Sequence, residues 1–259
     1  MSLDRSDPDR KDKKPKKEKS RSTLALAWLL LYNVAMTAGW TSIFWNVINE
    51  MILGNGNYKI LYHLSERQLI FFQTGAILEI FHAAVGLVPS SVILTTFQVF
   101  SRQIVLWGVI VPIVKVQINM GCAMCIFAWS MTEMIRYAYY AFALVGYMPY
   151  ILNWLRYTLF IVLYPIGVSG EILSIIRALP IVKQTELYTL HMPNKWNISI
   201  EYYYCLWATF PLYVMLFPQL YFHMFKQRAK ALGTKKSKTD TRRDFRDSAV
   251  KAMGRAKED

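Results

Sequence analysis

Six long apolar segments, separated by short polar stretches that contain turn-forming residues such as Pro89 and Pro149, dominate the hydrophobic pattern of this chain. We place them at Leu24–Ile48, Leu69–Val88, Val92–Val114, Ile118–Val145, Ile151–Leu179 and Ile200–Phe225. Roughly 20 helical residues cross the hydrocarbon core of a bilayer, so each segment is long enough to span a membrane. The pattern predicts an all-α polytopic membrane protein with six transmembrane helices.

The formal net charge of +13 lies mainly at the two ends of the chain. Residues 1–22 contain 9 of the 30 Lys and Arg with 5 acidic residues, and residues 226–259 contain 12 with 5. Residues 23–225 carry only 9 basic and 7 acidic groups. This long apolar centre, with a net charge of only +2, excludes the soluble nucleic-acid-binding domain that the net charge alone suggests. We divide the chain into a disordered basic tail (1–22), a membrane domain (23–225) and a second basic tail (226–259).

An even number of spans places both tails on the same side of the membrane. Because Lys and Arg are enriched on the cytosolic side, the tails predict that both termini are cytosolic, where they would also contact anionic lipid headgroups. The glycosylation sequon at Asn197 then falls in the lumenal loop between the last two helices.

Polar and ionisable residues recur at helical spacing inside four of the segments, where charge is costly and commonly functional. In chain order these stripes are Gly75, Glu79, His82 and Gly86; Thr95, Gln98 and Arg102; Ser130, Glu133, Tyr137 and Tyr140, with Arg136 beside Glu133; and Tyr157, Tyr164 and Glu171. Paired polar groups also fasten helices together, so each stripe has a structural interpretation. Since four neighbouring segments carry them, we favour a shared polar cavity.

The fifth segment carries the most informative stripe. Tyr164 and Glu171 share one helical face and lie about 10 Å apart along the axis. Between them, Pro165 predicts a kink, and Gly167 and Gly170 permit close approach of a substrate or another backbone. A phenol and a carboxyl in a water-poor cavity suit general acid–base chemistry, whereas the alternative for Tyr164 is a packing role.

Several chemistries are excluded by motifs that the chain lacks. Its four histidines do not cluster, and Glu79–His82 is the only Glu-x-x-His pair, which argues against a di-iron centre. The three cysteines lack the arginine of a cysteine phosphatase, and we interpret Cys122 and Cys125 as packing residues. No P-loop or dinucleotide glycine pattern occurs. Proton transfer on a lipid-like substrate, without metal or cofactor, remains.

The run from Arg156 through Tyr164-Pro165-Ile166-Gly167 to Glu171 closely resembles the very-long-chain (3R)-3-hydroxyacyl-CoA dehydratases, also described as protein tyrosine phosphatase-like proteins. Further matches lie at residues 129–137, 190–195 and 217–224, within a resemblance over roughly residues 24–228. It implies a six-helix enzyme of the endoplasmic reticulum membrane that dehydrates 3-hydroxyacyl-CoA to trans-2-enoyl-CoA during very-long-chain fatty acid elongation. It also implies that an elongase and an enoyl-CoA reductase act beside it.

The family's catalytic tyrosine and glutamate fall on Tyr164 and Glu171. We assign Glu171 as the base and Tyr164 as the acid or hydroxyl-orienting donor, while the reverse assignment stays open. Arg156 is expected to hold the anionic CoA at the cytosolic mouth. Arg136 and Arg102 are candidates either for thioester or phosphate contacts or for pairing with glutamates. The full set of candidate substrate-binding residues is Arg156, Arg136, Arg102, Tyr157, Gly167 and Glu133.

Two other classes of function stay open at this stage. The chain is also consistent with a catalytically silent family member that acts as a membrane scaffold, although the intact Tyr164/Glu171 pair argues against this. A proton-coupled transporter would use the same buried carboxyls, but the sequence shows no internal repeat of the kind that many transporters contain.

Overall fold

The computed structural model of this chain describes residues 23–193, 197 and 199–255, and beyond Ala229 it describes side chains only for residues 231 and 232. Within these residues the secondary structure is helical, apart from one isolated antiparallel bridge between Leu190 and Ile200. The all-α class is therefore confirmed. The predicted tail at residues 1–22 lies outside the described part of the chain.

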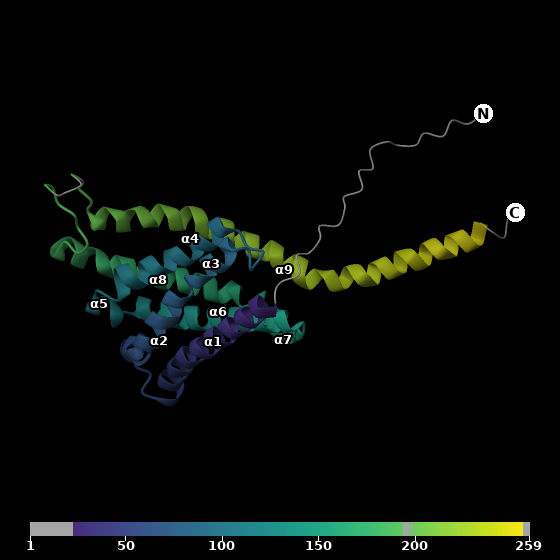
Figure 1. The fold of residues 1–259 in the computed structure, drawn as a ribbon, viewed down its shortest axis with the longest axis horizontal. Helices are drawn as coiled ribbons and strands as arrows, with labels where there is room; N and C mark the ends of the chain where they lie inside the picture. Colours follow the sequence, from purple (N-terminus) through teal and green to yellow (C-terminus); the bar gives the residue numbers. More distant parts are fainter. Residues whose placement is uncertain (1–22, 194–196, 198, 256–259) are drawn as a thin grey trace.

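Nine α-helices and three short irregular helices follow one another in the described chain (Figure 1). They are α1 (Thr23–Ile48), η1 (Asn49–Leu53), η2 (Tyr58–Ile60), α2 (Leu61–Gly75), α3 (Leu78–Ala84), α4 (Val92–Gln103), η3 (Ile104–Ile110), α5 (Val114–Gln117), α6 (Met120–Val145), α7 (Tyr150–Arg156), α8 (Phe160–Thr185) and α9 (Tyr202–Arg255). Of the irregular helices, η1 and η3 are π-helices and η2 is a 3₁₀-helix.

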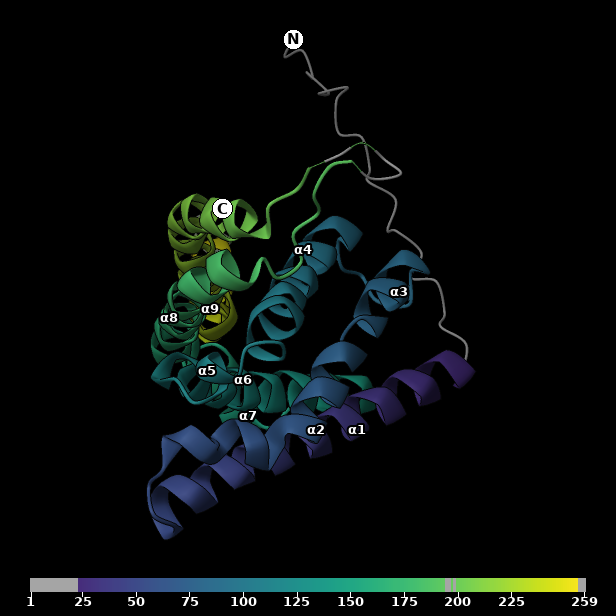
Figure 2. The ribbon, with the colours of Figure 1, turned by 90° about the vertical axis from the view of Figure 1, so that its left-hand side faces the viewer.

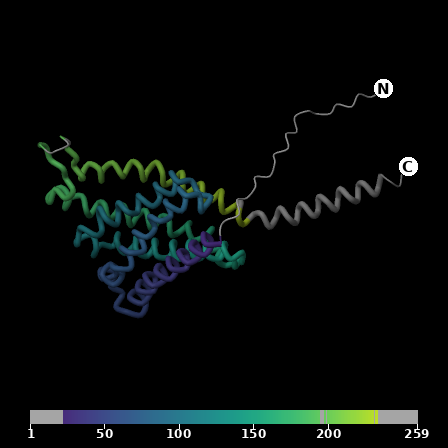
Figure 3. The backbone as a smooth tube through the Cα atoms, in the orientation of Figure 1, coloured from purple at the N-terminus to yellow at the C-terminus, as the bar shows by residue number. Residues whose placement is uncertain are grey.

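Helix α6 lies at the centre of the bundle. It packs against α1 on one side and against α8 on the other, and α9 in turn packs against α8 (Figure 2). Apolar side chains with almost no solvent exposure fill the interior, among them Trp40 of α1, Ile126 of α6 and Ile175 of α8. The chain runs along α8 to the 186–201 connection and returns along α9, so these two helices are antiparallel (Figure 3).

Four helical stretches have both the length and the hydropathy of a membrane span: Thr23–Leu53, Val92–Ile110, Phe160–Thr185 and Tyr202–Ala229. The membrane class predicted from the sequence is confirmed at this level. The predicted second span is divided into α2 and α3 by a turn at Ala76 and Ile77. The predicted fourth span is the 26-residue α6, whose polar stripe lowers its hydropathy.

The predicted fifth segment is also divided in two. Helix α7 ends at Arg156, and α8 begins at Phe160 after a turn closed by short-range bonds such as Thr158 N–H to Leu155 O (3.2 Å). The helix then continues through Pro165, where the sequence predicts a kink. The break therefore precedes the proline and leaves Arg156 on a separate short helix from Tyr164 and Glu171.

Candidate active site

Glu171 lies in the middle of α8 and is 9% exposed. Its Oε1 accepts a hydrogen bond from Nε1 of Trp129 in α6 (3.0 Å), and its Oε2 accepts one from the hydroxyl of Tyr213 in α9 (2.7 Å). Both donors are uncharged. No ion pair among the described residues includes Glu171. Three helices thus hold one carboxyl group by neutral hydrogen bonds.

A contact between two glycines brings α6 close enough for this arrangement. A Cβ atom added to Gly121 would lie 2.8 Å from the carbonyl oxygen of Gly170, and one added to Gly170 would lie 2.8 Å from that of Gly121. The two backbones therefore touch where neither residue has a side chain, as small residues allow between membrane helices. Gly170 precedes Glu171 directly, so this contact fixes the depth of Glu171 against α6.

Tyr164 lies two helical turns before Glu171 and is half-buried. Its ring stacks on two rings of α9, those of Phe217 (centroids 5.1 Å apart, planes at 8°) and Tyr221 (6.1 Å, 7°). Tyr164 and Glu171 therefore both contact α9, in keeping with the shared face that their spacing predicts. Its hydroxyl forms no hydrogen bond with the residues that the structure describes.

The remaining polar stripes meet in a charge network between α3, α4 and α6, and its Arg102 also lies within electrostatic range of Tyr164 and Glu171. Arg136 donates through Nη1 and Nη2 to the two carboxylate oxygens of Glu79 (3.0 and 2.7 Å) and through Nε to Glu133 (2.7 Å). Arg102 pairs with the other oxygen of Glu133, and the Tyr137 hydroxyl donates to Glu79. Two guanidinium groups thus balance two carboxylates. Of the two roles expected for the arginines, these contacts match pairing with the glutamates.

Arg156 is held by tyrosines at the end of α7. Its Nη2 donates to the hydroxyl of Tyr140 (3.1 Å), and its Cζ lies 4.6 and 4.8 Å from the ring centroids of Tyr139 and Tyr140. Tyr157 packs edge-on against Tyr139, with ring centroids 6.3 Å apart. No ion pair among the described residues includes Arg156, so no carboxylate of that part neutralises its charge.

Gly167, the remaining candidate, is buried and faces α6. A Cβ atom there would lie 3.4 Å from the Cβ of Ala128, which is a tight but ordinary contact. Of the two glycines at which the sequence predicts a close approach, Gly170 therefore makes the contact between backbones.

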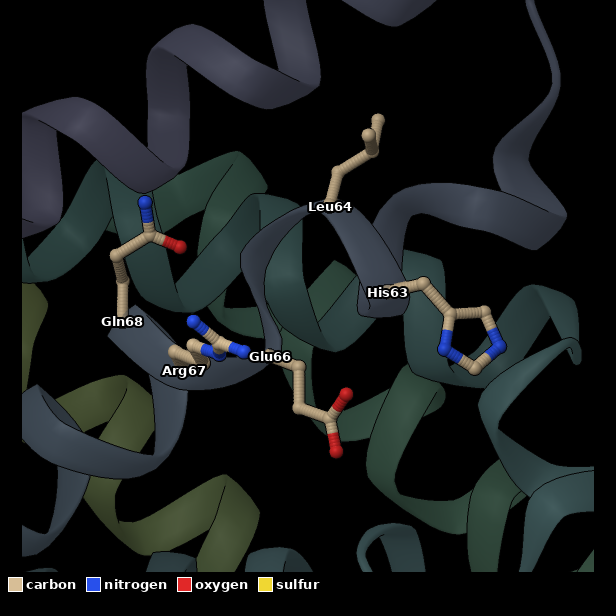
Figure 4. Close-up of a pocket in the computed structure, with 5 residues that line it drawn as sticks. All are labelled: His63, Leu64, Glu66, Arg67 and Gln68. Carbon is tan, nitrogen blue, oxygen red and sulfur yellow. The ribbon is translucent and has the colours of Figure 1, made fainter.

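A surface hollow of about 550 Å³ lies along α2 (Figure 4). Its lining residues are His63, Leu64, Glu66, Arg67 and Gln68. All five belong to one helix, and Leu64 points away from Glu66 (Figure 4). None of the candidate residues contributes to this hollow, so we do not assign it to the active site.

Three residues of α9 that contact the Tyr/Glu pair were not predicted as site residues. Tyr213, Phe217 and Tyr221 recur every four residues, which places them on one face of a helix. That spacing could have predicted a shared helical face, but aromatic residues occur throughout the last segment, so these three do not stand out from the others. Trp129 lies within a stretch that carries the family resemblance, without a role attached to it.

The fold and these contacts describe a helical membrane protein in which a half-buried phenol and a buried carboxyl share one helical face. The family model described as "Protein tyrosine phosphatase-like protein, PTPLA" matches residues 73–234, and the chain belongs to this family. That range includes every residue of the Tyr/Glu pair and of the charge network.

The chain is 50% identical to very-long-chain (3R)-3-hydroxyacyl-CoA dehydratase 2 of Mus musculus over 218 residues, 84% of this chain and 85% of that protein. It is 50% identical to the Homo sapiens dehydratase 2 (81% and 82% covered) and 43% identical to the dehydratase hpo-8 of Caenorhabditis elegans (80% and 94%). The resemblance drawn from the sequence is thereby confirmed. No solved structure matches the chain significantly.

Proposed function

We propose that this chain is a 3-hydroxyacyl-CoA dehydratase of very-long-chain fatty acid elongation. The observation that carries the proposal is the placement of Tyr164 and Glu171 on one face of α8, with the phenol hydroxyl unbonded by the described residues and the carboxyl oriented by two donors. The relatives named above supply the substrate class, because each is named as a very-long-chain (3R)-3-hydroxyacyl-CoA dehydratase.

In the proposed reaction Glu171 removes a proton from the carbon next to the thioester, which the thioester carbonyl makes acidic. The C–H electron pair forms the new double bond, the bond from carbon 3 to its hydroxyl breaks, and Tyr164 protonates the departing oxygen to give water. Glu171 ends protonated and Tyr164 deprotonated, and proton transfer between them through solvent restores both. General acid–base catalysis of this kind contributes roughly 10² to 10⁴ in rate.

The contacts of Glu171 support its assignment as the base. The indole of Trp129 can only donate, and the Tyr213 hydroxyl donates to the second oxygen, so both carboxylate oxygens act as acceptors. Donors aimed at both oxygens suit an ionised carboxylate. Tyr164, whose hydroxyl is free among the described residues, is then the group that donates to the substrate hydroxyl.

For the CoA we propose a site around Arg156 and Tyr157 at the end of the bundle that contains α7. The guanidinium of Arg156 has no carboxylate partner in the described chain, so it is available to a phosphate group. Arg102, Arg136 and Glu133 would support the site indirectly by fixing α4 to α6. Gly167 would leave room for the acyl chain beside α8.

We place the enzyme in the endoplasmic reticulum membrane, with six spans, both termini cytosolic, and the elongase and the enoyl-CoA reductase as partners. The support for this orientation is the excess of Lys and Arg in the two tails. It is tested by tagging each terminus in turn and measuring antibody access in cells whose plasma membrane alone is permeabilised. Access to both tags supports the orientation, and access to only one contradicts it.

The activity is tested with purified full-length chain and 3-hydroxyacyl-CoA, following enoyl-CoA formation. Tyr164→Phe and Glu171→Gln are each expected to lower kcat by roughly 10² or more. The exposed residues Tyr147 and Glu201 offer matched controls, and Tyr147→Phe and Glu201→Gln should leave kcat unchanged. Full activity in either folded site variant would overturn the assignment. A folded wild-type chain without activity would favour the silent scaffold instead.

A further inference from the structure

Pro165 leaves one carbonyl of α8 without its helical partner. In a continuous helix the backbone N–H of residue 165 would donate to the carbonyl oxygen of Ile161, but proline has no N–H. The hydroxyl of Tyr221, from α9, donates to this same oxygen at 3.1 Å. A side chain 56 residues further along the sequence thus replaces the hydrogen bond that Pro165 removes.

The ring of the same tyrosine contacts Tyr164, the residue directly before Pro165. The rings of Tyr164, Phe217 and Tyr221 are nearly parallel, with the Phe217 and Tyr221 centroids 5.5 Å apart and their planes at 11°. Tyr221 is held on its other sides by edge-on contacts with Phe160 and Phe225. Its hydroxyl is therefore aimed at Ile161 while its face orients the ring of Tyr164.

We propose that Tyr221 is a positioning residue for Tyr164. This rests on the proposed function of Tyr164 as the proton donor. Tyr221 acts in two ways: it satisfies the Ile161 carbonyl, which fixes the turn of α8 that begins at Ile161 and contains Tyr164, and it stacks on the Tyr164 ring. Since Tyr213 lies two turns earlier on the same face of α9 and binds Glu171, α9 sets the geometry of both reacting groups.

This role matters because few of the described side chains of α9 are buried. Leu206 is the only fully buried side chain among those described in α9. The hydrogen bonds of Tyr213 and Tyr221 therefore act together with the aromatic contacts between the two helices to hold α9 in register with α8. A displacement of a reacting group by about 1 Å can cost as much as 100-fold in rate.

The test is a double-mutant cycle in the full-length enzyme. Tyr221→Phe keeps the ring and removes the hydroxyl, and we expect kcat to fall roughly 10-fold with little change in KM. Pro165→Ala restores an N–H facing Ile161, so the hydroxyl becomes redundant. In the Pro165→Ala background, Tyr221→Phe should therefore lower kcat by less than roughly 2-fold. Tyr204→Phe, at an exposed position of α9, is the matched control and should have no effect.

Equal fold-losses from Tyr221→Phe in both backgrounds would overturn the proposal, as would an unchanged kcat in the single variant. Thermal unfolding of the four proteins gives a readout that does not depend on catalysis. Coupling in Tm without coupling in kcat would show that the hydrogen bond exists but does not position the donor, which also overturns the proposal. Failure of the proposed function is a separate outcome, since it appears as full activity in Tyr164→Phe.

Discussion

Two buried glutamates in this molecule are satisfied in opposite ways. Glu133, 2% exposed, is paired with the guanidinium groups of Arg102 and Arg136, which also binds Glu79. Glu171, 9% exposed, accepts hydrogen bonds from an indole and a phenol and forms no ion pair among the described residues, with Arg102 acting on it only from a distance. Both carboxyls sit in helices of the same bundle, and α6 contributes to both sites.

This difference in partners separates a glutamate that joins helices, Glu133, from a glutamate suited to proton transfer, Glu171. A carboxylate locked between two cations has its charge neutralised and its oxygens occupied, so it connects helices well and accepts a proton poorly. A carboxylate held by neutral donors keeps its charge and its orientation, as a general base requires. Two buried glutamates therefore serve different purposes, and the groups that bind each carboxylate determine its role.

The largest effects should come from exchanging each glutamate for glutamine, with opposite consequences. Glu171→Gln should lower kcat by roughly 10² to 10⁴ and leave Tm nearly unchanged. Glu133→Gln leaves a guanidinium without its counter-charge and should destabilise the fold by at most about 3 kcal/mol, since the Arg102 side chain is 28% exposed. Activity assays and thermal unfolding in detergent distinguish them. A large loss of stability in Glu171→Gln would contradict the comparison.

Next in size is the glycine contact that brings α6 to Glu171. Gly121→Ala puts a methyl group against the backbone of α8 and should cost about 1 to 3 kcal/mol in unfolding free energy. The control is Gly75→Ala, whose Cβ would meet only the Met36 sulfur at 3.7 Å. Comparable Tm values for the two variants would show that the glycine contact is not needed.

A smaller effect is expected from removing one donor to Glu171. Trp129→Phe keeps an aromatic ring and removes the N–H, and should lower kcat roughly 10-fold, the worth of one charge-assisted hydrogen bond. Trp45→Phe, at an exposed site on α1, controls for the loss of an indole. If Trp129→Phe raises KM and spares kcat, the indole serves binding rather than orientation of the base.

The smallest predicted change is in the charge network. Arg136→Lys retains the charge but not the planar fork that reaches both oxygens of Glu79 and also Glu133. We expect a loss of about 1 kcal/mol in unfolding free energy and, in protein that stays folded, a kcat within about 2-fold of wild type. A fall in kcat comparable to that of Glu171→Gln would place Arg136 at the reacting groups and abolish the distinction drawn above.

The sequence predicts the parts of this site that depend on spacing within one helix. The seven-residue interval of Tyr164 and Glu171 is enough to place both on one face, and the i, i+3 interval is enough to pair Glu133 with Arg136. The long-range partners, Glu79 with Arg136 and Tyr213 with Glu171, depend on how helices pack, which periodicity does not specify. The turn at residues 157–159 is likewise formed by local hydrogen bonds. It contains no glycine or proline, the residues from which a turn is usually predicted.

The Ile161 carbonyl accepts a hydrogen bond from a side chain in place of the backbone, and this has a consequence for the evolution of the sequence. The carbonyl needs one donor, and either an amide at position 165 or a hydroxyl at position 221 provides it. Loss of the hydroxyl should therefore be tolerated in lineages that have first replaced the proline, and the two positions should vary together across descendants. Proline with phenylalanine at these sites is the combination that we expect selection to remove.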